Sequence, residues 1–342
     1  MELLNTLYVT TPDSAIHKEG ESLVVKVDHV KRLQVPLHHL QSIVVMTQAW
    51  VSPELQRACL ERDMTLVFLS ERGRFLGRLE GTGAPGGLLR RDQMRAHLDP
   101  DRTLRLAQAL VKGKLGNQRQ VLQRAAREAR PGEGAALDEA AERLRLLQRQ
   151  VDGMETLDQV RGCEGDGAAW YFEQFETMVR QQRAAFPWHG RTRRPPRDPL
   201  NALLSFSYAL LMGDCLSACQ SVGLDPAIGF LHAFRPGRPA LALDLMEAFR
   251  PLVADRLVLT LINNLQIGPK GFRTSESGGI EMDEATRKLV IVTHQERKAQ
   301  TLRHPFLDQE IPWGLAPLLE AKLLARHLRG DLDAFPPFHP RG

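Results

Sequence analysis

The sequence predicts an α+β protein with a small N-terminal β-domain followed by a larger all-α domain. Short runs rich in Val, Leu, Ile and Thr occupy the first 80 residues, whereas apolar residues recur at helical spacing from Leu89 onward. Between these patterns lies GTGAPGG, residues 81–87, which is the clearest linker signal in the chain. We therefore expect a β-domain at 1–80, a linker at 81–88 and a helical domain at 89–342.

The N-terminal domain should consist of short strands and one helix. Turn residues separate the apolar runs, and Ser52 can cap a helix over residues 52–63. The runs that we expect to form strands lie at 3–10, 15–28, 31–37, 40–46, 65–70 and 73–81.

The C-terminal domain should be built from helices that begin and end at polar or glycine-rich breaks. A nearly uncharged helix at 199–223 has the composition of a core element, and a small hairpin is expected around Gly278 and Gly279. The remaining helices are expected at 91–129, 137–151, 161–182, from about 240 to 263, 293–304 and 313–330.

Composition excludes some classes of protein. No basic segment followed by an apolar one marks a secretory signal, and no segment looks apolar enough over sufficient length to span a bilayer. The four cysteines are scattered, so we expect buried free thiols in a reducing cytoplasm. The formal net charge is only +4.

The distribution of charge is more informative than its total. Residues 90–130 carry eleven Lys and Arg against four acids, and residues 180–197 carry six Arg and no acid. Such patches fit the phosphate backbone of a nucleic acid. Four arginines in the proline-rich loop at 189–199 are the candidates for this contact: Arg191, Arg193, Arg194 and Arg197.

Two acids interrupt an otherwise apolar helix. Asp244 and Glu247 are three residues apart and share a helix face, and His232 lies one loop upstream. Glu164 stands among small residues in GCEGDGAAWYF, where a ligand or another helix could approach. One histidine and two or three carboxylates suit Mg²⁺ or Mn²⁺. The alternative is that His232 is a satisfied structural histidine and that the acids face water or pair with Arg238 or Arg250.

Several of these motifs together resemble a known family. GCEGDGAAWYF, DPLNALLSFSYALL, GFLHAFRPGRPALALDLMEAFRP and the C-terminal GLAPLLEAKLLARHLRGDLDAFPPF look like the CRISPR-associated adaptation integrases, the first-numbered Cas family (Cas-one). KLGNQRQVL is also similar to that family. The C-terminal half looks most like the version found with type I-C systems.

The resemblance implies a metal-dependent DNA endonuclease and integrase that joins short DNA fragments, the spacers, into a CRISPR array. It makes the helical domain the catalytic one and makes Glu164, His232 and Glu247 ligands of Mg²⁺ or Mn²⁺. It also places Asp244 at the catalytic site, as a ligand or as an orienting residue, and it leaves Asp166 without a role. The implied partners are double-stranded DNA, a second copy of the chain, the small second Cas protein (Cas-two) and the iron–sulfur nuclease Cas-four.

Two other functions compete with this interpretation. A non-catalytic DNA-binding scaffold would keep the basic patches and need no metal, and a metallohydrolase of small phosphoesters would need no basic surface.

A shared site for several acids also predicts an effect on stability. If the carboxylates repel one another in the absence of metal, Glu247→Ala should stabilise the metal-free protein.

Overall fold

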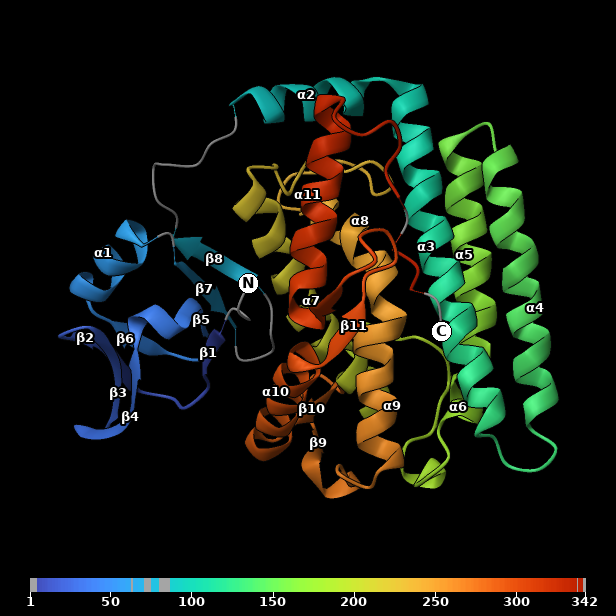
Figure 1. Cartoon of the computed structure of the whole chain (residues 1–342). Coiled ribbons are helices and arrows are strands. Elements are labelled where there is room, and N and C mark those ends of the chain that lie inside the picture. Colours follow the sequence, from blue (N-terminus) through green and yellow to red (C-terminus); the bar gives the residue numbers. More distant parts are fainter. Residues whose placement is uncertain (1–4, 63, 71–74, 80–86, 337, 341–342) are drawn as a thin grey trace. The chain divides into compact units, whose positions relative to one another are not determined.

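The computed structural model describes residues 5–62, 64–70, 75–79, 87–336 and 338–340 (Figure 1). The chain forms two compact units, Met1–Pro85 and Gly86–Gly342. Most of the expected linker, residues 81–86, lies outside the described residues. Residues 87 and 88 are helical, because α2 (Gly87–Leu98) begins there.

The first unit contains two four-stranded sheets. In one, the strand order is β1-β5-β7-β8, and β8 alone pairs antiparallel to its neighbour. In the other, the order is β4-β3-β2-β6, and β6 alone pairs in parallel. The strands are β1 (Asn5–Val9), β2 (Ser14–Glu19), β3 (Ser22–Val27), β4 (Val30–Pro36), β5 (Leu40–Val45), β6 (Ala49–Val51), β7 (Thr65–Leu69) and β8 (Phe75–Leu79).

Apolar side chains from both sheets and from α1 (Pro53–Glu61) share one core, which includes Ile16, Leu23, Ile43 and Leu55. Ser52 caps α1 as expected, since its hydroxyl accepts a hydrogen bond from the Leu55 N–H. The strand that the sequence pattern missed is β6, because three residues are too few to show an alternation.

The second unit is mainly helical, and α3 (Pro100–Arg127) is its longest described helix. This helix contacts α4 (Gly134–Gln150), α5 (Leu157–Glu173) and α8 (Ala240–Phe249). The other helices are α6 (Phe175–Met178), α7 (Pro199–Val222), α9 (Arg256–Asn263), α10 (Glu284–Ala299) and α11 (Ala316–Arg329).

The description of this unit as all-α was wrong in two places. β9 (Phe272–Thr274) and β10 (Ile280–Met282) form the expected hairpin, in which Gly278 adopts a φ of +73°. A second pair, β11 (Thr301–Arg303) and β12 (Glu310–Pro312), was not expected. The helix predicted at 293–304 is the second half of α10, which begins at Glu284 and ends at Ala299. Residues 301–303 of the predicted range form β11 instead.

The helix expected from about 240 to 263 is not continuous. Pro251 has no N–H to donate to the preceding turn, and the chain widens into a π-helix, η4, over Arg250–Asp255. The chain therefore forms three consecutive helical segments, α8, η4 and α9, in place of one helix. Glu247 lies on α8, Arg250 begins η4 and Arg256 begins α9.

One helix corrects the statement that no segment could span a bilayer. α7 is long and apolar enough to do so by length and composition, but 61% of its most apolar window is buried against the rest of the protein. That burial matches the expected core element. The four cysteines are free and buried, also as expected.

Candidate active site

Both acids of α8 are buried rather than solvated. The side chains of Asp244 and Glu247 are 0% and 1% exposed. Buried carboxylates need partners, because an ionised group loses its hydration when it leaves water. The two residues find different partners, which gives them different roles.

Asp244 organises the chain that carries His232. Its Oδ2 accepts hydrogen bonds from the backbone N–H groups of Phe230 and Leu231 at 2.5 and 3.0 Å, and its Oδ1 accepts one from the His232 N–H at 2.8 Å. The same Oδ1 lies 2.7 Å from His232 Nδ1. An ionised carboxylate only accepts hydrogen bonds, so Nδ1 is the nitrogen that donates to Asp244, and Nε2 is the nitrogen that faces Glu247.

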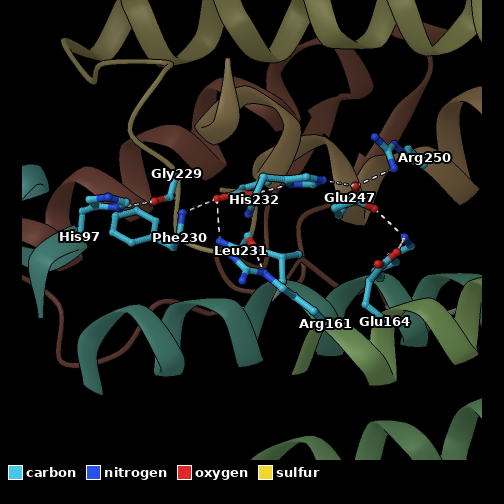
Figure 2. A network of polar contacts seen from close by, with 11 residues as sticks. His97, Arg161, Glu164, Gly229, Phe230, Leu231, His232, Glu247 and Arg250 are labelled. Carbon is cyan, nitrogen blue, oxygen red and sulfur yellow. Dashed lines mark hydrogen bonds and ion pairs between the residues drawn. The ribbon is translucent and has the colours of Figure 1, made fainter. Parts of the chain in front are cut away.

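The loop that ends at His232 is also held by side chains from other helices. His97 on α2 contacts the Gly229 carbonyl at 2.7 Å, and Arg161 on α5 donates to the Leu231 carbonyl at 2.8 Å (Figure 2). A Cβ atom on Gly229 would lie 2.7 Å from Asp244 Oδ2, so only glycine lets the loop approach this closely. These contacts fix the position of the imidazole.

Glu247 lies between three nitrogen-bearing side chains. Its Oε1 is 2.6 Å from Arg250 Nη1 and 3.6 Å from His232 Nε2, and its Oε2 is 2.7 Å from Lys114 Nζ. Lys114 also pairs with Glu164 Oε1 on α5. The lysine ammonium therefore bridges two carboxylates from different helices.

The charges around Glu247 keep it ionised. Burial by itself would raise the pKa of Glu247, but the charges of Arg250 and Lys114, with a smaller effect of His232, outweigh burial and lower the pKa to about 2. The carboxylate is therefore negative across the physiological range.

The close approach of α5 to α3 brings Glu164 to the site. A Cβ atom on Gly167 would lie 2.3 Å from a Leu115 methyl carbon, so Gly167 permits this helix contact. Gly165 faces open space instead. Asp166 is exposed, and two residues along a helix it cannot share the face of Glu164. The structure thus separates Asp166 from the site.

The donor set fits a hard divalent cation. Glu164, His232 and Glu247 supply two carboxylates and an imidazole nitrogen. Asp244 accepts from His232 Nδ1, and a carboxylate in this position commonly orients a metal-binding histidine. Glu247 Oε2 is buried, and it accepts no well-directed hydrogen bond from the described residues. Within that part of the chain no three His, Cys, Asp or Glu side chains form a ready metal cluster. Lys114 stands between the two glutamates.

Two members of this cluster were not predicted as site residues. Lys114 lies on α3 beside Asn117 and Gln118, and all three are buried. The motif KLGNQ places three polar residues on a helix face that is otherwise apolar. This pattern is the sequence signal that could have indicated a polar site there. Arg250 pairs with Glu247, as the alternative interpretation suggested, but the pair is buried.

The carboxylate of Glu247 is therefore surrounded by positive groups and not by other unpaired carboxylates. Its removal would leave Arg250 without its ion-pair partner and Lys114 with Glu164 alone. The expectation that Glu247→Ala stabilises the metal-free protein does not fit this arrangement, because breaking a buried ion pair is destabilising.

A second buried group adjoins Arg250. Asp255 Oδ1 accepts a hydrogen bond of 2.6 Å from the Tyr208 hydroxyl, and the Arg250 guanidinium lies 5.3 Å from the centre of the Tyr208 ring. Burial raises the pKa of Asp255 to about 6, although the hydrogen bond from Tyr208 and the charge of Arg250 oppose this rise.

The structure separates the four arginines of the basic loop. Arg193, Arg194 and Arg197 are exposed. Arg191 instead donates to Asn201 Oδ1 at 2.7 Å and to Ser205 Oγ at 3.1 Å, and it stacks on Tyr208. It holds the loop to α7, so its guanidinium is occupied by contacts within the protein.

Sequence comparison shows the family of the chain. The family described as CRISPR associated protein Cas1 matches residues 7–296. The chain belongs to the Cas1 family. A relative from Rhodospirillum rubrum, CRISPR-associated endonuclease Cas1 2, is 48% identical over 98% of both chains. A Cas4 exonuclease/Cas1 endonuclease fusion from Geobacter sulfurreducens is 36% identical over 98% of this chain and 60% of the fusion.

Solved structures show the same fold at lower identity. The Cas1 protein TM1797 from Thermotoga maritima has a TM-score of 0.82 and 22% identity, with 97% of this chain and 99% of that chain covered. A chain from a Cas6-RT-Cas1–Cas2 complex has a TM-score of 0.81 and 22% identity, covering 99% of this chain and 36% of that chain.

Proposed function

We propose that this Cas1 family member is a metal-dependent DNA endonuclease and integrase of CRISPR adaptation that joins spacers into a CRISPR array. One observation carries the proposal: Glu164 and Glu247, from separate helices, meet at one internal cation, Lys114, and His232 Nε2 lies 3.6 Å from Glu247 Oε1. Family membership supports it, since a relative 48% identical is named a CRISPR-associated endonuclease.

The residues divide into ligands and supports. Glu164, Glu247 and His232 Nε2 would hold Mg²⁺ or Mn²⁺, which supplies charge stabilisation at a phosphodiester. Asp244 is a positioning residue, because both its oxygens are occupied by backbone N–H groups and by His232 Nδ1. Lys114 and Arg250 add positive charge beside the carboxylates, where a phosphate oxygen can accept hydrogen bonds from them.

The proposed reaction is a transesterification. The 3′-hydroxyl oxygen of the spacer forms a bond to the phosphorus at the repeat end. The attacking hydroxyl loses its proton, the bond from that phosphorus to the adjoining 3′-oxygen of the array strand breaks, and the leaving oxygen takes up a proton. One phosphodiester replaces another, so no nucleotide cofactor is needed.

The partners and setting are part of the proposal. Double-stranded DNA is the substrate, and Arg193, Arg194 and Arg197 are the exposed candidates for its backbone. Cas2 and Cas4 are proposed partners, supported by relatives that carry a Cas4–Cas1 fusion or occur in a Cas1–Cas2 complex. We place the protein in the cytoplasm, in a type I-C-like system. Genes for Cas2 and Cas4 beside a CRISPR array would support this.

Homodimerisation through the N-terminal domain is a separate proposal. The sheets of this unit have edge strands, such as β4 and β6, which an equivalent unit can cover. Crosslinking followed by mass spectrometry should find intermolecular links within residues 1–80. Links confined to the helical unit would contradict it.

Replacement of one ligand tests the catalytic proposal. His232→Ala should abolish Mn²⁺-dependent strand transfer of a labelled spacer into a repeat-containing duplex. The loss should be at least about 100-fold, because even the residues that only orient a metal ligand contribute about 10–100-fold. DNA affinity should change little, since phosphate contacts supply most of it. A non-catalytic scaffold predicts instead that the wild type shows no metal-dependent transfer.

A further inference from the structure

A cavity of about 310 Å³ lies at the C-terminal end of α3, apart from the catalytic side chains. Residues of α3, of α9 and of the segment that follows α6 line it. Three arginines contribute to the lining, Arg124, Arg180 and Arg256, against one acid, Glu128.

The single acid is shared by two of the arginines. Glu128 Oε1 lies 3.1 Å from Arg124 Nε, and its Oε2 lies 3.1 Å from Arg180 Nη2. Arg256 has no hydrogen bond or ion pair with any described residue. Three positive charges and one negative charge leave a surplus of two on the cavity wall.

Burial and this surplus lower the pKa of two half-buried arginines. Burial and the charge of Arg124 lower the pKa of Arg256. Burial, together with Arg256 and Arg124, lowers the pKa of the neighbouring Arg297 to about 10. Arg180 and Arg256 are half-buried and Arg124 is exposed, so an anion can reach the excess positive charge and neutralise it. Thr260 and Asn264, both exposed at the rim, offer further hydrogen-bonding groups.

The cavity lies on the same face of α3 as Lys114. Val121 and Ala125 line the cavity and follow Lys114 at helical repeats of seven and eleven residues. At 1.5 Å per residue, Arg124 is about 15 Å along the helix axis from Lys114. A DNA duplex advances 3.4 Å per base pair, so this span corresponds to about four or five base pairs.

We propose that this cavity binds a backbone phosphate of the DNA whose reacting phosphodiester lies at Glu164, His232 and Glu247. The proposal rests on the proposed function, because it assumes DNA at the catalytic residues. Three convergent guanidinium groups suit a phosphate, and the volume exceeds that of roughly ten water molecules, which leaves room for the adjoining sugar. The contact ignores base identity and therefore anchors any sequence.

The test compares Arg256→Gln, Glu128→Gln and Arg326→Gln in binding to a 30-base-pair duplex from 50 to 300 mM KCl without divalent metal. Arg256→Gln should weaken binding several-fold and reduce the slope of log K against log[salt] by about 0.9, the value for one phosphate. Glu128→Gln should strengthen binding, since it removes the competing acid. Arg326 is exposed on α11, away from the cavity, and Arg326→Gln should match the wild type.

A thermal melt separates this effect from loss of folding. Arg256→Gln should not lower the Tm, because Arg256 forms no hydrogen bond or ion pair with a described residue and its charge is repelled by that of Arg124. Unchanged affinity and slope in Arg256→Gln, with normal wild-type strand transfer, would overturn the inference and leave the proposed function standing. Absent wild-type strand transfer would overturn the proposed function, whatever the binding data show.

A free nucleotide is the other source of the same phosphate chemistry. Wild-type and Arg256→Gln proteins should show equally small thermal shifts with 1 mM dAMP if the cavity serves a DNA strand. A large shift that depends on Arg256, combined with unchanged DNA binding, would assign the cavity to mononucleotides and contradict the proposal.

Discussion

The two charged regions along α3 differ in how far the chain itself compensates their charge. Around Lys114, three buried or half-buried acids, Glu164, Asp244 and Glu247, meet two cations, Lys114 and Arg250. Around Arg124, three arginines meet one acid. The first region is nearly neutral before any ligand arrives, whereas the second keeps a surplus of positive charge. A cation entering the first must displace a lysine, whereas an anion can enter the second directly.

The π-helix η4 connects the two regions. Arg250 at its start pairs with Glu247, and Arg256, directly after its end, lines the cavity. Asp255 lies between them and faces Arg250 through Tyr208. Substitutions at each point show whether the two regions are compensated as the geometry indicates.

The largest effect on stability should come from Lys114→Met. This change leaves Glu247 buried with only Arg250 opposite, and breaking a buried pair costs about 3–5 kcal/mol. The Tm in EDTA should fall by on the order of 10 °C. Mn²⁺ should raise the Tm of the variant more than that of the wild type, because it can replace the missing charge.

Lys112→Met is the matched control for that variant. Lys112 lies two residues earlier on α3 and pairs with Asp152, whose side chain is 66% exposed. Its loss should change the Tm little, as surface ion pairs contribute about 0–1 kcal/mol. Equal melts for both variants would mean that Lys114 does not compensate the acids.

Asp255→Asn should change the pH dependence of stability. The pKa of Asp255 is raised from 3.8 to about 6 in the folded protein, so the native state binds this proton more tightly than the unfolded chain. Its contribution is present below about pH 4 and is lost as the pH rises through 6, a difference of about 3 kcal/mol. Urea unfolding from pH 4.5 to 7.5 should show this loss in the wild type and not in the variant. Parallel curves for the two proteins would refute it.

Asp244→Asn should weaken metal binding without removing a ligand. An amide cannot accept from all three backbone N–H groups and also hold the Nδ1 proton of His232, so the imidazole loses its orientation. The Mn²⁺ concentration for half-maximal strand transfer should rise 10–100-fold. High Mn²⁺ should restore most of the activity, which distinguishes Asp244 from the ligand His232. An unaltered Mn²⁺ requirement would contradict the positioning role.

The smallest effect should come from the surface arginines. Replacing Arg193, Arg194 and Arg197 together by Gln should weaken DNA binding a few-fold and reduce the salt slope by about 1–3, depending on how many phosphates they contact. Arg191→Gln is the informative comparison. It should lower the Tm and leave the slope unchanged, because its guanidinium is bound to α7. The opposite pattern would assign Arg191 to DNA.

Local patterns predicted much of the fold and less of the site. A serine cap located α1 and a long apolar run located α7, since these signals lie within one segment. The helix expected at 161–182 instead begins at Leu157 and is divided into α5 and α6. β6 and β11 are too short for a pattern, and their pairing partners are distant or follow an irregular turn. Motif resemblance selected Glu164, His232 and Glu247. It did not select Lys114, whose role depends on two other helices. Nor could spacing show that Arg191 turns inward.

Asn117 has a consequence for how the active site forms during folding. Its side-chain amide donates to the carbonyl oxygens of Ala248 and Phe338, which are 131 and 221 positions away along the chain. One turn of α3 separates it from Lys114, so the lysine reaches its place only after these distant segments have closed on the helix. Contacts of such long sequence separation form slowly and late, because chain closure costs entropy before the contacts reward it. The cluster around Lys114 should therefore be absent from early folding intermediates. If it binds Mn²⁺ as proposed, the rate at which a refolding chain acquires the ion would report the last step of folding rather than the first.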